Sequence, residues 1–294
     1  MAHKAGFVNI IGSPNVGKST LMNVLVGERL SIITSKAQTT RHRIMGIVSG
    51  EDFQIVYSDT PGVLKPNYKL QESMMDFVNT ALTDADVILF VTDIYEDIRI
   101  EEKILNKIKN TTAKVLLLVN KVDLAKTQEQ LEEKVQYWKN EVPKAEVIPV
   151  SALEKFNTDY VFNRILANLP ESPGFYDKDQ LTDKPEKFFV SEIIREKILM
   201  NYKKEIPYSV EVVVESFKDE EKIIKIRAEI IVVRDSQKGI IIGHQGKALK
   251  RVGVEARKDL EEFFQKQIFL ELFVKVNKDW RDNDTQLKRF GYNN

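Results

Sequence analysis

The segment that most constrains this chain is the octapeptide Gly-Ser-Pro-Asn-Val-Gly-Lys-Ser at residues 12–19. It matches the pattern G-x-x-x-x-G-K-[ST], which a shuffled chain of this composition would contain only about 0.006 times. The apolar run at 7–11 predicts a strand before it, and the spacing of Leu21, Val24 and Leu25 predicts a helix after it. Between a strand and a helix, the backbone N–H groups of such a loop form a cradle for phosphate oxygens. The octapeptide therefore predicts a phosphate-binding loop.

Two side chains at the end of this loop carry most of its chemistry. Lys18 brings a positive charge to the β- and γ-phosphates of a nucleotide, and the hydroxyl of Ser19 can ligate Mg²⁺. We expect the whole loop to contact the nucleotide. The candidate binding residues are Gly12, Ser13, Pro14, Asn15, Val16, Gly17, Lys18, Ser19 and Thr20.

The tetrapeptide Asp-Thr-Pro-Gly at 59–62 follows another predicted strand. Alone it means little, because D-x-x-G occurs about once by chance in a chain of this composition. At the carboxyl end of a strand beside the phosphate loop, however, Asp59 can hold Mg²⁺ directly or through water. The N–H of Gly62 can meet a γ-phosphate there. We add Asp59, Thr60, Pro61 and Gly62 to the candidate nucleotide-binding residues.

The segment Asn-Lys-Val-Asp at 120–123 ends a further predicted strand and indicates a choice of base. A carboxylate at Asp123 can accept both hydrogen bonds from the guanine N1–H and N2–H₂ edge, which adenine lacks. The side chain of Asn120 can reach N7, and the stem of Lys121 can cover the purine face. The phosphate loop alone would fit ATP equally well, and Asp123 is the residue that argues against ATP.

The tripeptide Val-Ser-Ala at 150–152 ends the last predicted strand of this half. A backbone N–H at this place could contact guanine O6, so Ser151 and Ala152 complete the candidate nucleotide site. Each short motif is weak alone, but their order along the chain and their positions at strand ends favour GTP as the ligand.

Strand and helix patterns alternate through the first 170 residues, which predicts a mostly parallel sheet covered on both faces. The neighbouring runs 45–48 and 53–57 read as a hairpin, so one antiparallel strand is expected at the sheet edge. Two prolines and a glycine within 169–177 then indicate a boundary. We predict domains at 1–170 and 185–294, with a linker at 171–184.

The second half of the chain predicts a small α+β domain with the element order α-β-β-α-α-β. The tetrapeptide Gly-His-Gln-Gly at 243–246 lies in a region near 240–264 that otherwise reads as helix. Seven basic and two acidic residues between Arg234 and Lys258 give a local charge of +5, although Lys+Arg and Asp+Glu are both 44 in the whole chain. The glycines would let a nucleic-acid backbone approach. The candidate RNA-binding residues are Gly243, His244, Gln245, Gly246, Lys247, Lys250 and Arg251.

The composition argues against several other classes of protein. The chain has no cysteine and only three scattered histidines, so disulfides, thiol nucleophiles and histidine-based metal cages are not expected. The longest apolar runs, such as 87–91, have about a quarter of the length of a membrane span. No secretory signal is visible at the start. These features fit a protein of the reducing cytoplasm.

The motifs in the first half resemble the translation-factor-like class of GTPases, and Gln-Thr-Thr-Arg-His at 38–42 resembles the first switch of the Era family. The resemblance implies that Thr40 supplies the second protein hydroxyl to Mg²⁺ when the γ-phosphate is present, with Thr39 as the alternative. It also implies catalytic roles for Lys18, Thr40 and Gly62.

The second half resembles the type II KH domain, and the combination resembles the Era family over nearly all of residues 5–292. This implies an α/β P-loop GTPase domain followed by a small α+β KH domain. It further implies a monomeric bacterial cytoplasmic GTPase that binds the 3′ end of 16S ribosomal RNA and assists assembly of the small (30S) subunit. Peripheral association with the inner membrane belongs to the same resemblance.

One residue departs from the pattern of Ras-type enzymes. These place a water-orienting glutamine directly after the glycine of D-x-x-G, whereas this chain has Val63 there. Related GTPases with a hydrophobic residue at this place use K⁺, with an asparagine matching Asn15. The resemblance therefore implies a K⁺ site formed by Asn15 and carbonyls of 33–38. The alternative is an arginine supplied by a partner. In that case Asn15 only braces the loop through its backbone.

Two further functions stay open at this point. The chain could be an RNA-binding scaffold that the nucleotide gates, with negligible intrinsic hydrolysis, since Val63 cannot orient water. A GTPase for membrane remodelling would need a lipidation signal or a basic amphipathic helix, and neither terminus supplies one.

Overall fold

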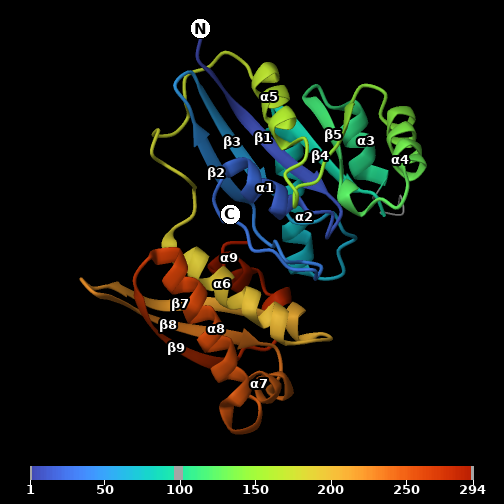
Figure 1. Ribbon diagram of the computed structural model, residues 1–294. Helices are drawn as coiled ribbons and strands as arrows, with labels where there is room; N and C mark the ends of the chain where they lie inside the picture. Colours follow the sequence, from blue (N-terminus) through green and yellow to red (C-terminus); the bar gives the residue numbers. More distant parts are fainter. Residues whose placement is uncertain (1, 96–101, 293–294) are drawn as a thin grey trace. The chain divides into compact units, whose positions relative to one another are not determined.

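The computed structural model describes residues 2–95 and 102–292 of the chain. These residues form two compact units. The first holds the residues up to Asn67 together with Gln71–Asp183, and the second holds Tyr68–Leu70 together with the residues from Lys184 onward. Each unit is a sheet with helices packed against it (Figure 1).

The first unit is built on a sheet in the order β2-β3-β1-β4-β5-β6. All neighbouring strands are parallel except β2 and β3, which pair antiparallel at one edge. The predicted sheet type and its antiparallel edge strand are thus confirmed. The strands are β1 Lys4–Gly12, β2 Ile44–Ser49, β3 Phe53–Asp59, β4 Val87–Asp93, β5 Lys114–Asn120 and β6 Glu146–Pro149.

Helices cover both faces of this sheet. Every residue of β4 is buried, and because successive side chains of a strand point to opposite faces, both faces must be covered. The apolar spacing also predicts a helix near 99–109, of which residues 99–101 lie outside the described residues. The helices are α1 Lys18–Val26, α2 Lys69–Thr83, α3 Glu102–Asn110, α4 Gln128–Glu141 and α5 Thr158–Asn168, with a 3₁₀ turn η1 at Val122–Leu124.

The parallel register brings the loops with the sequence motifs to one edge of the sheet. Ile10 pairs with Asp59, and the neighbouring strand places Gly12 beside Val91. Farther along the sheet, Asp93 pairs with Asn120. The carboxyl ends of β3, β1, β4 and β5 therefore lie along one edge of the sheet, which is where ligands bind in open α/β sheets.

Residues 171–183 run along the edge of the first unit. Gly46 forms a bridge with Thr182, and the N–H of Ile47 donates to the carbonyl of Leu181 at 2.8 Å. The hydroxyl of Thr182 also donates to the carbonyl of Met45 at 2.7 Å. The segment predicted as a linker thus covers strand β2, whose free N–H and C=O groups would otherwise form an open sheet edge.

The second unit shows the predicted order α-β-β-α-α-β around the sheet β7-β8-β9, in which β7 and β8 are antiparallel and β8 and β9 parallel. The helical region near 240–264 is divided in two by the glycine turn. The elements are α6 Glu186–Asn201, η2 Ile206–Tyr208, β7 Val210–Asp219, β8 Ile223–Val232, α7 Asp235–Ile242, η3 His244–Gly246, α8 Lys247–Phe264, β9 Gln267–Val276, η4 Trp280–Asp282 and α9 Asp284–Arg289.

The core of the second unit lies between its helices and one face of the sheet. On α8, Val252, Ala256 and Leu260 are fully buried as their spacing predicts. Phe263 on the same face stays 37% exposed and stacks on Phe189 of α6. The helix is held by its apolar stripe, which leaves its basic side chains at the surface.

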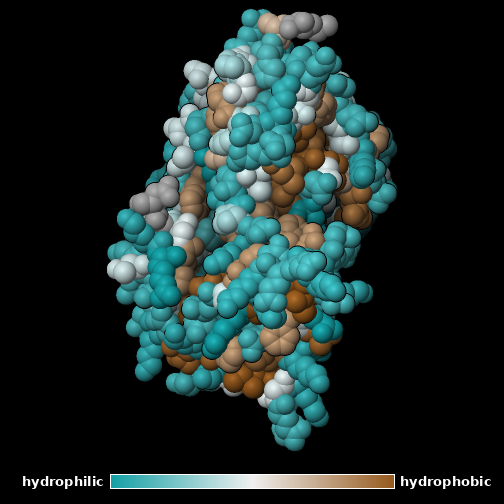
Figure 2. Space-filling model, turned by 90° about the vertical axis from the view of Figure 1, so that its left-hand side faces the viewer, coloured by the Kyte–Doolittle hydropathy of each residue, from teal (hydrophilic) through white to brown (hydrophobic). Residues whose placement is uncertain are grey.

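Apolar residues on the face shown in Figure 2 form patches separated by hydrophilic residues. Among the described residues, no helix combines the length and apolar character that a membrane crossing requires. The same residues contain no group of three or more His, Asp or Glu side chains placed to hold a metal by themselves.

Candidate nucleotide site and nucleic-acid groove

The phosphate loop joins β1 to α1, and two of its glycines are required by the packing around them. Gly17 has a φ of 96°, and a Cβ there would lie 2.3 Å from Nδ2 of Asn120. A Cβ on Gly12 would lie 2.0 Å from the carbonyl oxygen of Val91. Asn15 also adopts a positive φ of 65°. The loop is therefore tightly curved against the neighbouring strand ends, as a phosphate cradle requires.

Lys18 is the first residue of α1, and its side chain folds back over the loop. Its Nζ donates to the carbonyl of Ser13 at 2.8 Å, and the residue is only 6% exposed. The ammonium group is thus held across the mouth of the loop. An anion seated there would meet both this charge and the N-terminus of α1.

Three oxygen-bearing side chains from different segments meet beside the loop. The hydroxyl of Ser19 lies 2.7 Å from Oδ2 of Asp59 and 2.8 Å from Oγ1 of Thr40. Thr40 Oγ1 in turn lies 3.2 Å from the same carboxylate oxygen. Two hydroxyls and one carboxylate form an oxygen donor set of the kind that Mg²⁺ prefers.

The second carboxylate oxygen of Asp59 strengthens this assignment. Oδ1 is buried without a hydrogen-bond partner, an arrangement that costs free energy unless a cation or another donor meets it. Burial raises the pKa of Asp59, while the charge of Lys18 and the hydroxyls of Ser19, Ser31 and Thr40 act in the opposite direction. The residues present thus fit a divalent cation.

The fold distinguishes Thr39 from Thr40, whereas the sequence spacing left both as candidates for the second Mg²⁺ hydroxyl. Thr39 Oγ1 lies 2.6 Å from the hydroxyl of Thr34 and donates to the carbonyl of Lys36, also at 2.6 Å. These bonds keep Thr39 within its own loop, so it is Thr40 that reaches Asp59.

The segment after Asp59 passes close to the phosphate loop. A Cβ on Gly62 would lie 2.8 Å from both N and Cα of Pro14, so a side chain at Gly62 would collide with the loop. The N–H of Val63 donates to the carbonyl of Gly12 at 3.0 Å, and the hydroxyl of Thr60 donates to the carbonyl of Ile10 at 2.7 Å. These contacts hold Gly62 beside the place of the phosphates.

The residues predicted to bind the base lie at the ends of β5 and β6. Asp123 is exposed, and its Oδ1 accepts from the hydroxyl of Ser151 at 2.5 Å. Lys121 has a φ of 60°, and its Nζ donates to the carbonyl of Asn15 at 2.6 Å. Asp123 is therefore joined to Ser151, and Lys121 to the phosphate loop.

Two roles in this region were missed by sequence reasoning. Asn120 is buried and joins two loops, because its Nδ2 donates to the carbonyl of Val16 at 2.8 Å and its Oδ1 accepts from the N–H of Ala152 at 2.9 Å. Asp93, at the end of β4, accepts from Nζ of Lys121 at 2.5 Å. No motif marks Asp93, and only the strand register could have indicated it.

The glycine turn of the second unit lies between α7 and α8. Gly243 and Gly246 have φ values of 70° and 73°, and Gln245 between them also has a positive φ of 52°. A Cβ on Gly243 would lie 2.6 Å from that of Ala248. The turn therefore exposes backbone at the start of a long helix whose first turns carry Lys247, Lys250 and Arg251, which suits the approach of a phosphate backbone.

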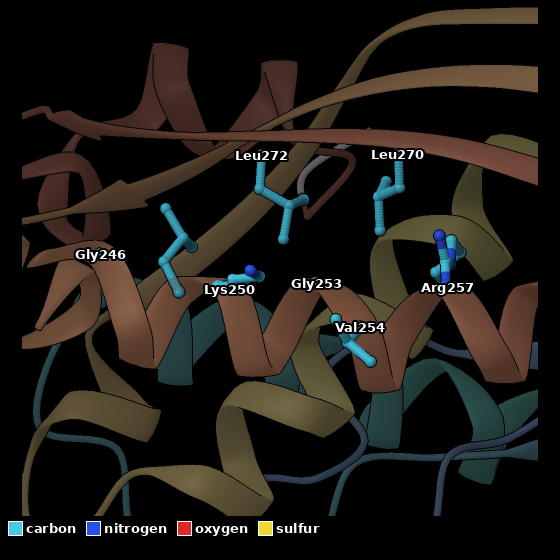
Figure 3. A pocket seen from close by; sticks show the side chains of 8 residues that line it. Gly246, Lys250, Gly253, Val254, Arg257, Leu270 and Leu272 are labelled. Carbon is cyan, nitrogen blue, oxygen red and sulfur yellow. The ribbon is translucent and has the colours of Figure 1, made fainter.

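A groove runs from this turn between α8 and β9. Leu270 and Leu272 project from β9 toward the helix, and Lys250 and Arg257 lie along α8 (Figure 3). Of the predicted RNA-binding residues the structure brings Gly246 and Lys250 to the groove. The other five, Gly243, His244, Gln245, Lys247 and Arg251, are not among its lining residues. The other groove-lining residues were not among the candidate RNA-binding residues: Leu249, Gly253, Val254, Arg257, Leu270 and Leu272.

Comparisons with known families match each unit separately. The family described as a 50S ribosome-binding GTPase matches residues 7–121, and the KH domain matches residues 205–281. With the phosphate loop and the glycine turn described above, they define the class of this protein, a P-loop GTPase that carries a KH domain. It is an enzyme that hydrolyses GTP.

Relatives of full length narrow the class to one family. The chain is 44% identical to the GTPase Era of Staphylococcus haemolyticus over 292 residues, which covers 99% of this chain and 97% of the relative. The GTPase Era of Staphylococcus epidermidis is 43% identical over the same share. The chain belongs to the Era family of GTPases.

Solved structures of the family have the same fold. A single-residue variant of Aquifex aeolicus Era bound to GDP·AlF₄⁻ is 38% identical, with a TM-score of 0.94 over 98% of this chain and 99% of that one. Era in complex with MgGDPNP and nucleotides 1506–1542 of 16S ribosomal RNA is also 38% identical, with a TM-score of 0.94 over 99% of both chains. The likeness covers both units, so the predicted family and fold class are confirmed.

Proposed function

We propose that this chain is a GTP-driven switch that binds 16S ribosomal RNA near its 3′ end through the KH groove and assists assembly of the 30S subunit. The observation that carries the proposal is the occurrence, in one chain, of a phosphate loop beside an oxygen donor set and of a KH unit with a glycine turn and a groove beside a basic helix start. The likeness to an Era structure that holds both MgGDPNP and 16S nucleotides supports it.

Within the nucleotide site we assign separate tasks to separate residues. Ser19, Thr40 and Asp59 hold Mg²⁺, which neutralises charge on the phosphates when it is bound. Lys18 and the backbone N–H groups of the loop orient the β- and γ-phosphates, and the N–H of Gly62 meets the γ-phosphate. Because phosphoryl transfer depends mostly on positioning and electrostatic stabilisation, these contacts supply the catalysis that this chain provides alone.

Base recognition falls to the ends of β5 and β6. We assign Asp123 to the N1–H and N2–H₂ groups of guanine, and we assign Ser151 to holding that carboxylate in place, since their oxygens are 2.5 Å apart. The backbone N–H of Ala152 donates to Asn120, so its contact with guanine O6 requires a shared hydrogen bond. Lys121 covers the purine with its stem.

We also propose that a bound K⁺ supports hydrolysis in this chain, which has Val63 in place of the water-orienting glutamine. Val63 is 6% exposed, so its side chain is packed inside and takes no part in orienting water. Asn15 is exposed and lines the same cavity as Ile33 and Gln38. The carbonyls of 33–38 and the side chain of Asn15 could therefore share one monovalent cation beside the phosphates.

The RNA-binding part of the proposal rests on the groove between α8 and β9. Apolar side chains from Leu270 and Leu272 offer surfaces for bases, and Lys250 and Arg257 offer charge to phosphates. His244 and Gln245 lie in the glycine turn at its end. An extended single strand could place its backbone over the turn and its bases in the groove.

The proposal includes a setting for this work. We infer a monomer in the bacterial cytoplasm, where the small ribosomal subunit is assembled. Peripheral association with the inner membrane rests on the family resemblance alone. The alternative of a scaffold with negligible hydrolysis is favoured by Val63, and it differs from the main proposal only in rate.

Single-turnover hydrolysis of GTP, measured with and without a 16S fragment corresponding to nucleotides 1506–1542, tests the proposal. We expect the RNA to bind and the hydrolysis rate to rise with it. A fragment of scrambled sequence and equal length is the control. Binding without any measurable turnover in either state would favour the scaffold, and equal binding of both fragments would contradict the assignment to the 16S 3′ end.

A further inference from the structure

Close in sequence to Thr40 and Asp59, two of the residues assigned to Mg²⁺, lies a closed network of polar side chains centred on Arg43. Its Nε donates to the hydroxyl of Ser58 at 2.5 Å, and Nη1 and Nη2 donate to the two carboxylate oxygens of Asp84 at 2.6 and 3.0 Å. Nη2 also donates to Oδ1 of Asn9 at 3.2 Å. One guanidinium thus binds three side chains at once.

Asn9 closes the network on its other side. Its Nδ2 donates to Oδ1 of Asp84 at 2.6 Å and to the carbonyl of Ala81 at 2.7 Å. Asn9 and Ser58 are fully buried and Arg43 is 8% exposed, while the Asp84 side chain reaches solvent. This set of four donations suits arginine, because its N–H groups stand on three nitrogens in a fixed planar fork, whereas an ammonium group has three N–H groups on one nitrogen.

The network joins the chain segments that carry two of the three assigned Mg²⁺ ligands. Arg43 lies three residues after Thr40, and Ser58 lies directly before Asp59. The ladder between β2 and β3 pairs Ile44 with Asp59. Bonding Arg43 to Ser58 therefore fixes how the Thr40 segment lies relative to the carboxylate.

The residues on the other side of Thr40 are bound differently. Thr39 bonds to Thr34 and Lys36 in its own loop, whereas Arg43 bonds to β1, β3 and the segment after α2. The first switch at 38–42 thus has a tightly held end at Arg43.

We infer that Arg43, held by Asp84, is a positioning residue that fixes this end of the first switch so that Thr40 meets Asp59 and Ser19. The inference rests on the proposed function in one respect, since it takes Thr40 as a Mg²⁺ ligand in the triphosphate state. It adds that the geometry of Thr40 depends on a guanidinium outside the nucleotide site.

A specific consequence separates positioning from general stability. Thr40 is assigned to Mg²⁺ only when a γ-phosphate is present, so loss of the Arg43 network should weaken binding of Mg·GDPNP more than binding of Mg·GDP. General destabilisation of the domain would weaken both alike. The ratio of the two dissociation constants is therefore the readout.

The experiment uses the full chain with Arg43→Met, which removes the guanidinium, and Asp84→Asn, which breaks the ion pair at nearly constant volume. Arg164→Met is the matched control, because Arg164 makes a similar bidentate pair with Glu146 between α5 and β6. We expect GDPNP affinity to fall about tenfold more than GDP affinity in Arg43→Met. Asp84→Asn should show a smaller change of the same sign, and Arg164→Met an unchanged ratio. The Mg²⁺ concentration for half-maximal GDPNP binding should rise in the first two variants.

Thr40→Ala, measured in the same titration, separates the inference from its premise. If Thr40→Ala lowers the GDPNP preference and the Arg43 and Asp84 variants do not, the positioning role is overturned while the assignment of Thr40 stands. If Thr40→Ala leaves the preference unchanged, both are overturned. An equal change of the GDPNP-to-GDP ratio in Arg164→Met would also overturn the inference. If Arg43→Met fails to fold, the ratio measured for Asp84→Asn decides whether the inference stands.

Discussion

The side-chain oxygen of Asn120 accepts a hydrogen bond from the backbone N–H of Ala152 at 2.9 Å, which joins the ends of two neighbouring strands. The amide nitrogen of the same side chain donates to the phosphate loop at Val16. One buried amide therefore connects the phosphate and base ends of the nucleotide site.

We predict that Asn120→Ala destabilises the protein and weakens nucleotide binding. The substitution leaves the Val16 carbonyl and the Ala152 N–H without this partner in a buried place, a loss of about 1–3 kcal/mol. Urea unfolding without nucleotide measures the effect. Asn110→Ala is the control, because that amide donates to a carbonyl of its own helix at the surface. Equal stability of the two variants would contradict the connecting role.

Asp123→Asn should shift the preference from guanosine toward xanthosine nucleotides. An amide can donate to the carbonyl that replaces the guanine 2-amino group, and one bidentate contact is worth about 1–3 kcal/mol of discrimination by analogy with base readout. Competition between GDP and XDP for the purified variant measures it. Wild-type protein that binds ATP as well as GTP would show that residues 120–123 have been assigned wrongly.

Replacement of His244 and Gln245 by aspartates should weaken RNA binding and leave GTP affinity unchanged. The new charges repel the phosphate backbone, and the flanking glycines keep the turn. Titration of a fluorescent 16S fragment at moderate salt measures the loss. A matched double replacement by asparagines tests side-chain shape without charge, and it should lower RNA affinity less than the aspartates do. An unchanged dissociation constant for the aspartate variant would remove the turn from the RNA-binding surface.

Hydrolysis should be faster in K⁺ than in Na⁺ at equal ionic strength, and Asn15→Ala should remove the difference. The reason is the proposed cation site, which Asn15 completes with carbonyls of 33–38. Initial rates of phosphate release in the two salts, for both proteins, provide the measurement. Equal wild-type rates would refute the K⁺ proposal and direct attention to an arginine supplied by a partner.

Without Mg²⁺ and nucleotide, ionisation of Asp59 should weaken the fold. Burial raises the pKa of Asp59, so the folded state binds this proton more tightly than the unfolded state. Stability then falls as the pH rises above the ordinary carboxyl pKa of 3.8. We therefore expect Asp59→Asn to be more stable than wild type at neutral pH.

Urea unfolding of the metal-free proteins between about pH 5 and pH 8 checks this expectation. Asp52→Asn changes an exposed carboxylate and should leave stability nearly unchanged. An Asp59→Asn protein less stable than wild type throughout this range would show that Lys18 and the neighbouring hydroxyls outweigh burial. The variant should also lose Mg²⁺-dependent GTP binding.

Much of the fold could be predicted because its signals are local. Apolar runs such as β4 and β5 are buried on both faces, so their composition alone marks them as central strands. The glycine turn at 243–246, in contrast, lies inside a region that reads as helix. The predicted order of two successive helices implies a break in this region, and the positive φ angles of Gly243 and Gly246 show where it lies.

The sequence by itself determined the class of this protein, because a phosphate cradle and a guanine-reading carboxylate need particular residue types at fixed short spacings. It also determined the order of the elements, which follows from periodicity. The tertiary structure decided what depends on distant segments: Thr40 over Thr39 at Asp59, Arg257 in the groove, and Arg43 bound to Asp84. These contacts join residues through strand register and helix packing, and no local spacing records which side chains such packing brings within hydrogen-bond distance.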